Sequence, residues 1–208
     1  MKADPRKLME SATAAWESLA PGLERLILEE GTQLYRLGSE QALPAEALEQ
    51  GFEILVLGGT LLLEQGSLGP EGYAREPEFS GGELRSPGGC ELLLKRGPFA
   101  PADRQRLCLQ SSQAPWLPGQ GNLRVKPLHH FEGFNTALVH WPAGEHFVPH
   151  RHFGGEEVFV LSGTFEDEHG RYPKGTWIQS PHLSQHHPFV SEETVIFVKT
   201  GHLHPGLA

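Results

Sequence analysis

The chain has 208 residues, of which 25 are glycine and 17 are proline, and its formal net charge is −9. Because it carries no basic cluster, we expect no nucleic-acid partner. No run approaches the ~18 apolar residues of a membrane span, and residues 1–6 lack the apolar region of a signal peptide, so we expect a cytoplasmic protein. The two cysteines, Cys90 and Cys108, are then expected to be reduced thiols.

The pattern of apolar residues predicts an all-β fold. Runs rich in valine, leucine and phenylalanine are broken by turn residues about every ten positions, a spacing typical of short strands. Ahead of the first run, Asp4-Pro5 can cap a helix in which Leu8, Met9 and Trp16 recur at helical spacing. We therefore expect one short N-terminal helix followed by strands.

The sequence repeats itself with an offset near 104 residues. Residues 55–60 (LVLGGT) match residues 159–164 (FVLSGT), and residues 90–95 (CELLLK) match residues 194–199 (TVIFVK). Such self-similarity is the mark of a duplicated structural unit. The repeat predicts two β-barrels or sandwiches of the same fold, in domains spanning residues 1–110 and 111–208, with a linker at about residues 98–112.

All twelve histidines lie after residue 128, and three of them belong to two short motifs. The first, G-x5-H-x-H-x3-E-x6-G, supplies His150, His152 and Glu156, and the second, G-x5-P-x4-H, ends at His186. Alternation along a strand puts His150 and His152 on one face, and the glycines at 154 and 155 can turn the chain so that Glu156 returns beside them. Three imidazoles and a carboxylate suit one divalent transition metal (Zn, Fe, Mn, Ni or Cu) better than Ca or Mg.

The first repeat lacks these ligands. The overlay aligns Glu156 with Phe52 and His186 with Gly82, and residues 44–48 (PAEAL) stand where His150 and His152 would be. We therefore expect the first domain to bind no metal and to serve as a structural unit, as an interface, or as an apolar ligand pocket.

Two further residues are candidates for an outer shell around the metal. His146 shares strand parity with His150 and could face the cavity mouth, although a solvated loop position is the alternative. Gln179 lies on a predicted strand before the second motif and could hydrogen-bond a bound water or substrate, or it could face solvent. The acidic run at residues 166–168 is interpreted as a solvated hairpin turn.

The two motifs resemble those of the cupin superfamily, whose small β-barrels supply three histidines and one glutamate to a metal. The amino-acid sequence in and around these motifs is similar to that of the ChrR-type cupins. The similar segments are PHRHFGGEE at 149–157, GTFEDEHG at 163–170 and YPKG at 172–175. One departure is Leu183, where cupins usually have glycine. The resemblance implies His150, His152, Glu156 and His186 as the ligand set.

The ChrR-type group includes both the cupin domain of a zinc-dependent anti-sigma factor and small metal-dependent dioxygenases. The anti-sigma activity belongs to a separate helical domain with an H-x3-C-x2-C zinc site, and this chain has no histidine or cysteine before Cys90. The resemblance therefore implies either a dioxygenase acting on a small oxygenated organic molecule held in the second barrel, or a non-catalytic zinc-binding sensor. Neither the motifs nor the resemblance identifies the catalytic residues. Cupins commonly pair, and two barrels present many sheet edges, so we also expect a homodimer.

Overall fold

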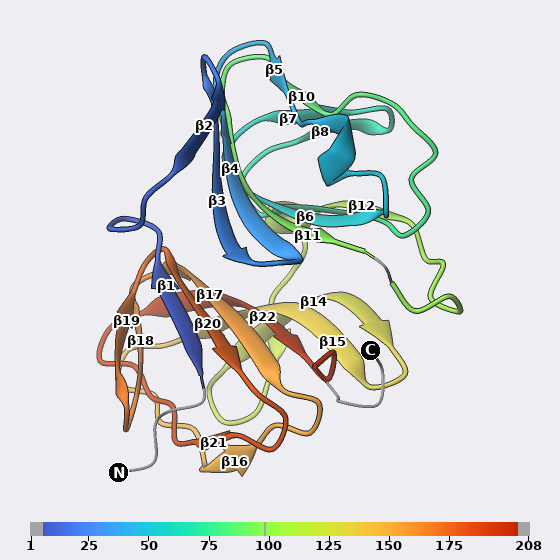
Figure 1. Cartoon of the computed structure of the whole chain (residues 1–208). Coiled ribbons are helices and arrows are strands. Elements are labelled where there is room, and N and C mark those ends of the chain that lie inside the picture. Colours follow the sequence, from blue (N-terminus) through green and yellow to red (C-terminus); the bar gives the residue numbers. More distant parts are fainter. Residues whose placement is uncertain (1–5, 98, 204–208) are drawn as a thin grey trace. The chain divides into compact units, whose positions relative to one another are not determined.

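The computed structural model describes residues 6–97 and 99–203, and its regular secondary structure is almost entirely β-strand (Figure 1). The exceptions are two short 3-10 helices, η1 (Ala45–Ala47) and η2 (Ser111–Gln113). The chain divides into two compact units: one is Ala15–Ala114, and the other joins the N-terminal segment through Ala14 with the chain from Pro115 onward. Within the described ranges, no helix has the length and apolar character needed to cross a membrane.

The unit formed by Ala15–Ala114 is built on a seven-stranded antiparallel sheet. Its order is β12 (Leu107–Gln110), β9 (Gly72–Glu76), β6 (Phe52–Gly59), β11 (Cys90–Arg96), β4 (Thr32–Leu37), β3 (Leu23–Glu29) and β2 (Glu17–Ala20). A smaller sheet has the order β5 (Gln41–Ala42), β10 (Arg85–Ser86), β7 (Leu61–Leu63) and β8 (Gly66–Leu68). A continuous apolar core, which includes Tyr35, Phe52, Ile54 and Leu92, fills the unit.

The second unit repeats this strand order. Its large sheet runs β1 (Lys7–Glu10), β20 (Thr176–Ser180), β17 (Glu156–Ser162), β22 (Thr194–Thr200), β15 (Phe134–Trp141), β14 (Arg124–Phe131) and β13 (Leu117–Pro118). Two ribbons accompany it: β16 (His150–Arg151) with β21 (Gln185–His186), and β18 (Thr164–Asp167) with β19 (Gly170–Pro173). The strands β9 and β11 recur as β20 and β22 with the offset read from the sequence. The all-β prediction is confirmed.

The N-terminal helix prediction is wrong for the residues that the structure describes. Lys7–Glu10 forms β1, which pairs antiparallel with β20 from Lys7 opposite Gln179 to Glu10 opposite Thr176 (Figure 1). A short isolated helix is marginal because its first turn is costly to nucleate, whereas the open edge of β20 offers backbone partners at once. Asp4 and Pro5 lie outside the described residues.

The core of the second unit is apolar around the strands that carry the candidate site. Val158 and Val160 on β17 pack with Ile178 on β20 and with Trp141 and Phe165. Partly buried Phe147 joins this cluster from the loop that precedes β16. Val158 and Val160 therefore face inward, and the candidate site lies beside an apolar interior.

Candidate metal centre

The two-stranded ribbon β16–β21 brings the predicted histidines together. Its register places His150 directly opposite His186, and His152 follows at the end of β16. The turn to β17 passes through Gly154 and Gly155, both with positive φ (82° and 72°), which only glycine adopts without strain. The turn delivers Glu156 as the first residue of β17.

The four candidate side chains converge on one point. One potential ligand atom from each of His150, His152, Glu156 and His186 lies within 4.8 Å of the other three. The Nε2 atoms of His152 and His186 are 2.9 Å apart, and Oε1 of Glu156 lies 3.5 Å and 3.7 Å from them. Neighbouring ligands of a metal with bonds of ~2.1 Å are separated by about 3 to 3.4 Å. The donor set therefore fits a divalent transition metal, and the group of four could hold one.

Hydrogen bonds at the far side of two rings fix which nitrogen faces the centre. Nδ1 of His150 lies 3.0 Å from the backbone carbonyl oxygen of Val148. A carbonyl can only accept, so Nδ1 of His150 carries the proton and its Nε2 keeps a free electron pair. Nδ1 of His186 likewise faces a carboxylate, Oδ2 of Asp167, at 3.5 Å. This second contact leaves Nε2 of His186 as the ligand atom.

Burial sets the protonation of the centre. It lowers the pKa of His152 to about 3, with His186 and His150 as smaller causes, and it lowers the pKa of His150 as well. Burial also raises the pKa of Glu156 to about 7, an effect that His186 partly offsets and Asp167 reinforces. His150 and His152 are thus neutral at pH 7 and available as ligands, while the carboxyl of Glu156 is about half protonated there and releases its remaining proton when a metal binds.

Asp167 lies beside the candidate site although neither motif contains it. Its Oδ1 accepts hydrogen bonds from the backbone amides of His169 and Gly170 and from the hydroxyl of Tyr172, and its Oδ2 accepts from Arg6 at 2.7 Å. Burial alone would raise its pKa, but His186, the amide of His169, Tyr172 and Arg6 together hold the pKa of Asp167 well below its usual range. The carboxylate is therefore ionised beside the ring of His186.

The interpretation of residues 166–168 as a solvated turn is corrected by this network. Glu166 and Asp167 are buried, and only Glu168 is exposed. Asp167 does cap the hairpin between β18 and β19 through the two backbone amides, as its place in an Asp-x-x-Gly turn indicates. The sequence around Asp167 therefore indicates a turn, but it does not indicate the contact between Asp167 and His186.

The two outer-shell candidates do not join the four ligands. Gln179 stands opposite Glu157 in the β17–β20 pair, and its side-chain amide donates to the Glu157 carboxylate at 3.4 Å. Residues opposite one another share a sheet face, so Gln179 lies on the face away from Glu156. The ring of His146 stacks on Phe189 with a centroid distance of 5.2 Å. The neighbouring residue Phe147 is the one that contacts His150, at 5.0 Å.

The first unit presents no comparable cluster among the residues that the structure describes. Phe52, the counterpart of Glu156, is buried in the apolar core and packs edge-on against Phe79 at 5.4 Å. An apolar ring thus stands where the second unit has its carboxylate.

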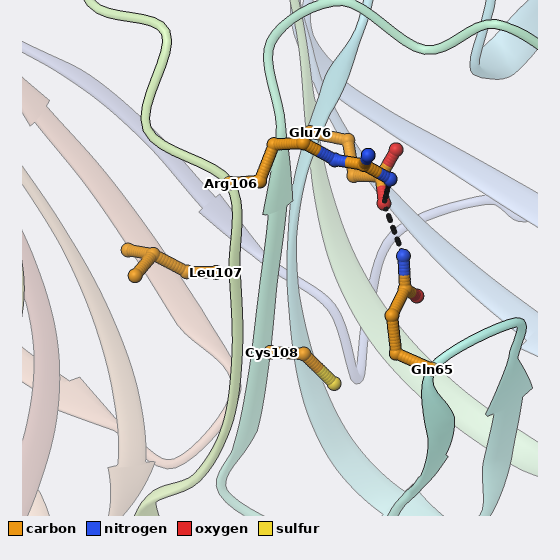
Figure 2. A pocket seen from close by; sticks show the side chains of 5 residues that line it. All are labelled: Gln65, Glu76, Arg106, Leu107 and Cys108. Atoms are coloured by element: carbon orange, nitrogen blue, oxygen red, sulfur yellow. Dashed lines mark hydrogen bonds and ion pairs between the residues drawn. The ribbon is translucent and has the colours of Figure 1, made fainter.

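A surface pocket of about 260 Å³ opens elsewhere in the first unit, as Figure 2 shows; its lining residues are Gln65, Glu76, Arg106, Leu107 and Cys108. Gln65 and Arg106 each donate to Oε1 of Glu76 at 2.7 Å. Burial and then Glu76 raise the pKa of Cys108, so its thiol stays protonated. Cys90 and Cys108 are both free, the first buried and the second exposed. The pocket therefore holds a paired carboxylate and an inert thiol, and no obvious reactive group.

Comparison with known proteins agrees with this geometry. Residues 104–204 match the family described as the ChrR cupin-like domain. No curated protein sequence is significantly similar to the chain.

Solved structures share the fold at low sequence identity. Protein Ylba from E. coli is 15% identical, with a TM-score of 0.74 over 96% of this chain and 92% of its own. A candidate dioxygenase from Nostoc punctiforme is 15% identical, with a TM-score of 0.71 over 95% of this chain and 82% of its own. A variant of oxalate decarboxylase from Bacillus subtilis is 13% identical, with a TM-score of 0.62 over 95% of this chain and 78% of its own. At these identities the likeness concerns the cupin fold alone.

Proposed function

Residues 104–204 are a ChrR cupin-like domain, and on that premise we propose that the chain is a two-barrel cupin whose second barrel binds one divalent transition metal. The metal is held by His150, His152, Glu156 and His186. The observation that carries the proposal is the convergence of these four ligand atoms within 4.8 Å, with their burial keeping His150 and His152 neutral. The first barrel, with Phe52 in the place of Glu156, is a structural unit.

We propose further that the site acts as a dioxygenase on a small oxygenated organic substrate bound in the second barrel. A redox-active metal there would supply Lewis acidity and one-electron chemistry. The chain's own contribution is an apolar surrounding of Trp141, Phe165 and Phe147, and a carboxyl, Glu156, that loses its proton when it becomes a metal ligand. Manganese is the leading candidate, because the oxalate decarboxylase that shares the fold has Mn(II) centres.

The second candidate function is a non-catalytic zinc-binding sensor. It is favoured by the ligand count, because four protein ligands can complete a tetrahedral Zn²⁺ site and leave no open position. The match to the ChrR cupin-like domain supports the same reading. Such a protein would report metal or ligand binding to a partner protein.

Elemental analysis tests the metal site directly. Protein purified from its native host should hold about one transition metal per chain, and the double variant His150→Ala/His152→Ala should lose it. A matched control, Phe52→Leu, changes the counterpart position in the first barrel and should leave the metal content unchanged. Full metal content in the double variant would refute the assignment.

Oxygen uptake then separates the two functions. The metal-loaded protein is assayed with β-diketone and hydroxyaryl-ketone substrates, and uptake that disappears in the double variant supports the dioxygenase. Tightly held Zn²⁺ without any redox-active metal would support the sensor.

We also propose that the chain forms a homodimer, since edge strands such as β12 and β1 end the two large sheets. Light scattering that gives the monomer mass of 22.9 kDa would contradict this.

A further inference from the structure

We propose that Asp167 and Arg6 are positioning residues of the metal site, so that metal binding and the docking of the N-terminal strand β1 strengthen each other. The inference rests on the proposed metal site and adds two residues to it that lie outside both cupin motifs. Arg6 is the residue directly before β1, and 144 or more positions separate it from every proposed ligand.

The contacts form one continuous chain from the ligand to the N-terminal segment. Nδ1 of His186 lies 3.5 Å from Oδ2 of Asp167, and the same oxygen accepts a 2.7 Å hydrogen bond from Nη1 of Arg6. Both partners are shielded from water, because the side chain of Asp167 is 1% exposed and that of Arg6 is 10% exposed. The guanidinium also lies over the ring of Tyr172, 5.7 Å from its centroid, while the Tyr172 hydroxyl donates to Oδ1 of Asp167.

This arrangement orients His186 through its outer nitrogen. The other oxygen of Asp167 is held by the amides of His169 and Gly170 and by Tyr172, so the carboxylate cannot rotate away from the imidazole. A metal on Nε2 makes the Nδ1 proton more acidic, which shortens its contact with a carboxylate. The contact of 3.5 Å is at the long limit of a hydrogen bond, and it has room to tighten when a metal binds.

The strand β1 fixes the place of Arg6. The register of β1 on β20 starts with Lys7 opposite Gln179, so the docked strand presents Arg6 at the hairpin that carries Asp167. Metal binding strengthens the contact between His186 and Asp167, and the ion pair with Arg6 holds Asp167 in place for that contact. The metal must therefore bind more tightly when β1 is docked on β20. By reciprocity, metal binding must favour the docked strand to the same extent.

The test measures Zn²⁺ affinity, by competition with a chromophoric chelator, in the wild-type protein and in four variants. Asp167→Asn should bind Zn²⁺ about 10–100-fold more weakly, the usual effect of losing such a partner, and Arg6→Gln should weaken binding in the same direction. Arg6→Lys restores a cation and should recover part of the loss. The matched control is Arg171→Gln, because the exposed side chain of Arg171 pairs with the buried Glu166 in the same hairpin and has no ion pair with a proposed ligand.

Two further readouts distinguish positioning from general destabilisation. The visible spectrum of the Co²⁺-loaded protein should change in Asp167→Asn, because the orientation of one ligand changes. Hydrogen exchange at residues 7–10 should slow when Zn²⁺ binds to the wild-type protein, and the slowing should shrink in Asp167→Asn. Wild-type affinity and an unaltered Co²⁺ spectrum in Asp167→Asn would overturn the inference, as would exchange at residues 7–10 that ignores Zn²⁺.

A separate measurement keeps the inference testable if the metal site itself is wrong. In the metal-free protein, nitrogen NMR reports which ring nitrogen of His186 carries the proton, and contact with Asp167 predicts Nδ1. If the wild-type protein binds no Zn²⁺, the proposed metal site fails. A proton on Nδ1 that becomes mixed between the nitrogens in Asp167→Asn would still support the positioning role, and an unchanged tautomer would refute it.

Discussion

Nε2 of His152 lies 2.9 Å from Nε2 of His186, and both nitrogens are within 3.7 Å of the same oxygen of Glu156. Nitrogens this close cannot both carry protons without strong repulsion, and burial lowers the pKa of His152 to about 3. One proton can bridge the two nitrogens as an N–H···N hydrogen bond, and a metal ion can replace that proton by accepting both electron pairs. A metal ion at this point would also neutralise the buried carboxylate of Glu156.

Metal affinity should therefore fall as the pH falls through about 7. Burial raises the pKa of Glu156 to about 7, and a metal binds only the deprotonated carboxylate, so each binding event displaces this proton. The lowered pKa values of His150 and His152 mean that those two rings contribute no such dependence near neutrality. Chelator competition between pH 6 and 8.5 measures the effect, and Glu156→Gln should flatten the curve around pH 7. An identical pH dependence in that variant would contradict the assignment.

The metal-free form of Glu156→Gln should be more stable than the metal-free wild type at pH 8. The folded pKa of about 7 lies above the ordinary value of 4.5, so the native state binds more protons than the unfolded state between these values. Stability then falls as the pH rises from 4.5 to 7, by up to roughly 3 kcal/mol. Denaturant titrations of both proteins in chelator at pH 4 and pH 8 check this; the gain should appear at pH 8 and vanish at pH 4.

Much of the metal site could be read from the sequence because the four ligands lie in two local patterns. Alternation placed His150 and His152 on one face, and the glycine pair predicted the turn that returns Glu156. The repeat likewise predicted matched strands, since each copy carries its own apolar pattern. Local spacing carried these predictions, and no long-range pairing was needed for them.

The misses share the opposite origin, because each depends on a pairing between distant segments. The segment Lys7–Glu10 is a strand only because the edge of β20 is free to accept it. Asp167 reaches His186 across 19 positions, and Gln179 is turned to Glu157 by the register of β17 on β20. A shift of one residue in that register would have reversed its face. The sequence alone does not specify such a register.

The turn before His186 contains a strained residue whose replacement should stabilise the protein. Leu183 has a φ of 66°, a conformation that costs an L-residue roughly 1–2 kcal/mol, and 44% of its surface is exposed. Its amide donates to the carbonyl of His152, so the backbone bond survives replacement. Leu183→Gly should gain about 0.5–1 kcal/mol after the larger unfolded-state entropy of glycine is included.

A thermal melt of metal-free Leu183→Gly checks this prediction. Val148→Gly is the control, because Val148 is another exposed apolar residue near the site but does not have a positive φ. The control should lose stability while Leu183→Gly gains it. A fall in melting temperature for Leu183→Gly would mean that its side chain makes a stabilising contact that outweighs the strain.

The turn at Gly154, between the candidate ligands His152 and Glu156, should tolerate an added side chain far less well than the open turn at Gly144. Gly154 has a φ of 82°, and a Cβ atom added there would overlap the backbone of Gly201, which cannot move independently of β22. Gly144 has a φ of 77°, but an added Cβ would meet nothing within 4 Å. Gly154→Ala should therefore cost about 2–5 kcal/mol and weaken metal binding, whereas Gly144→Ala should cost only about 1–2 kcal/mol and retain the metal. Equal losses in the two variants would contradict this account of the turn.

Replacing Glu156 by glutamine separates the two proposed functions. The substitution removes the charge of one ligand but keeps an oxygen donor of similar shape. If the metal is a structural Zn²⁺ with four protein ligands, Glu156→Gln should lower metal affinity and holo-protein stability together, because metal binding contributes to folding. If the site is catalytic and has open positions, water can replace the carboxylate, so metal is partly retained while activity changes sharply. We expect the second outcome, because the site adjoins an apolar interior suited to enclosing a ligand. Metal content and melting temperature of Glu156→Gln, each measured with metal present, distinguish the two functions. Complete metal loss with a large fall in melting temperature would favour the zinc sensor.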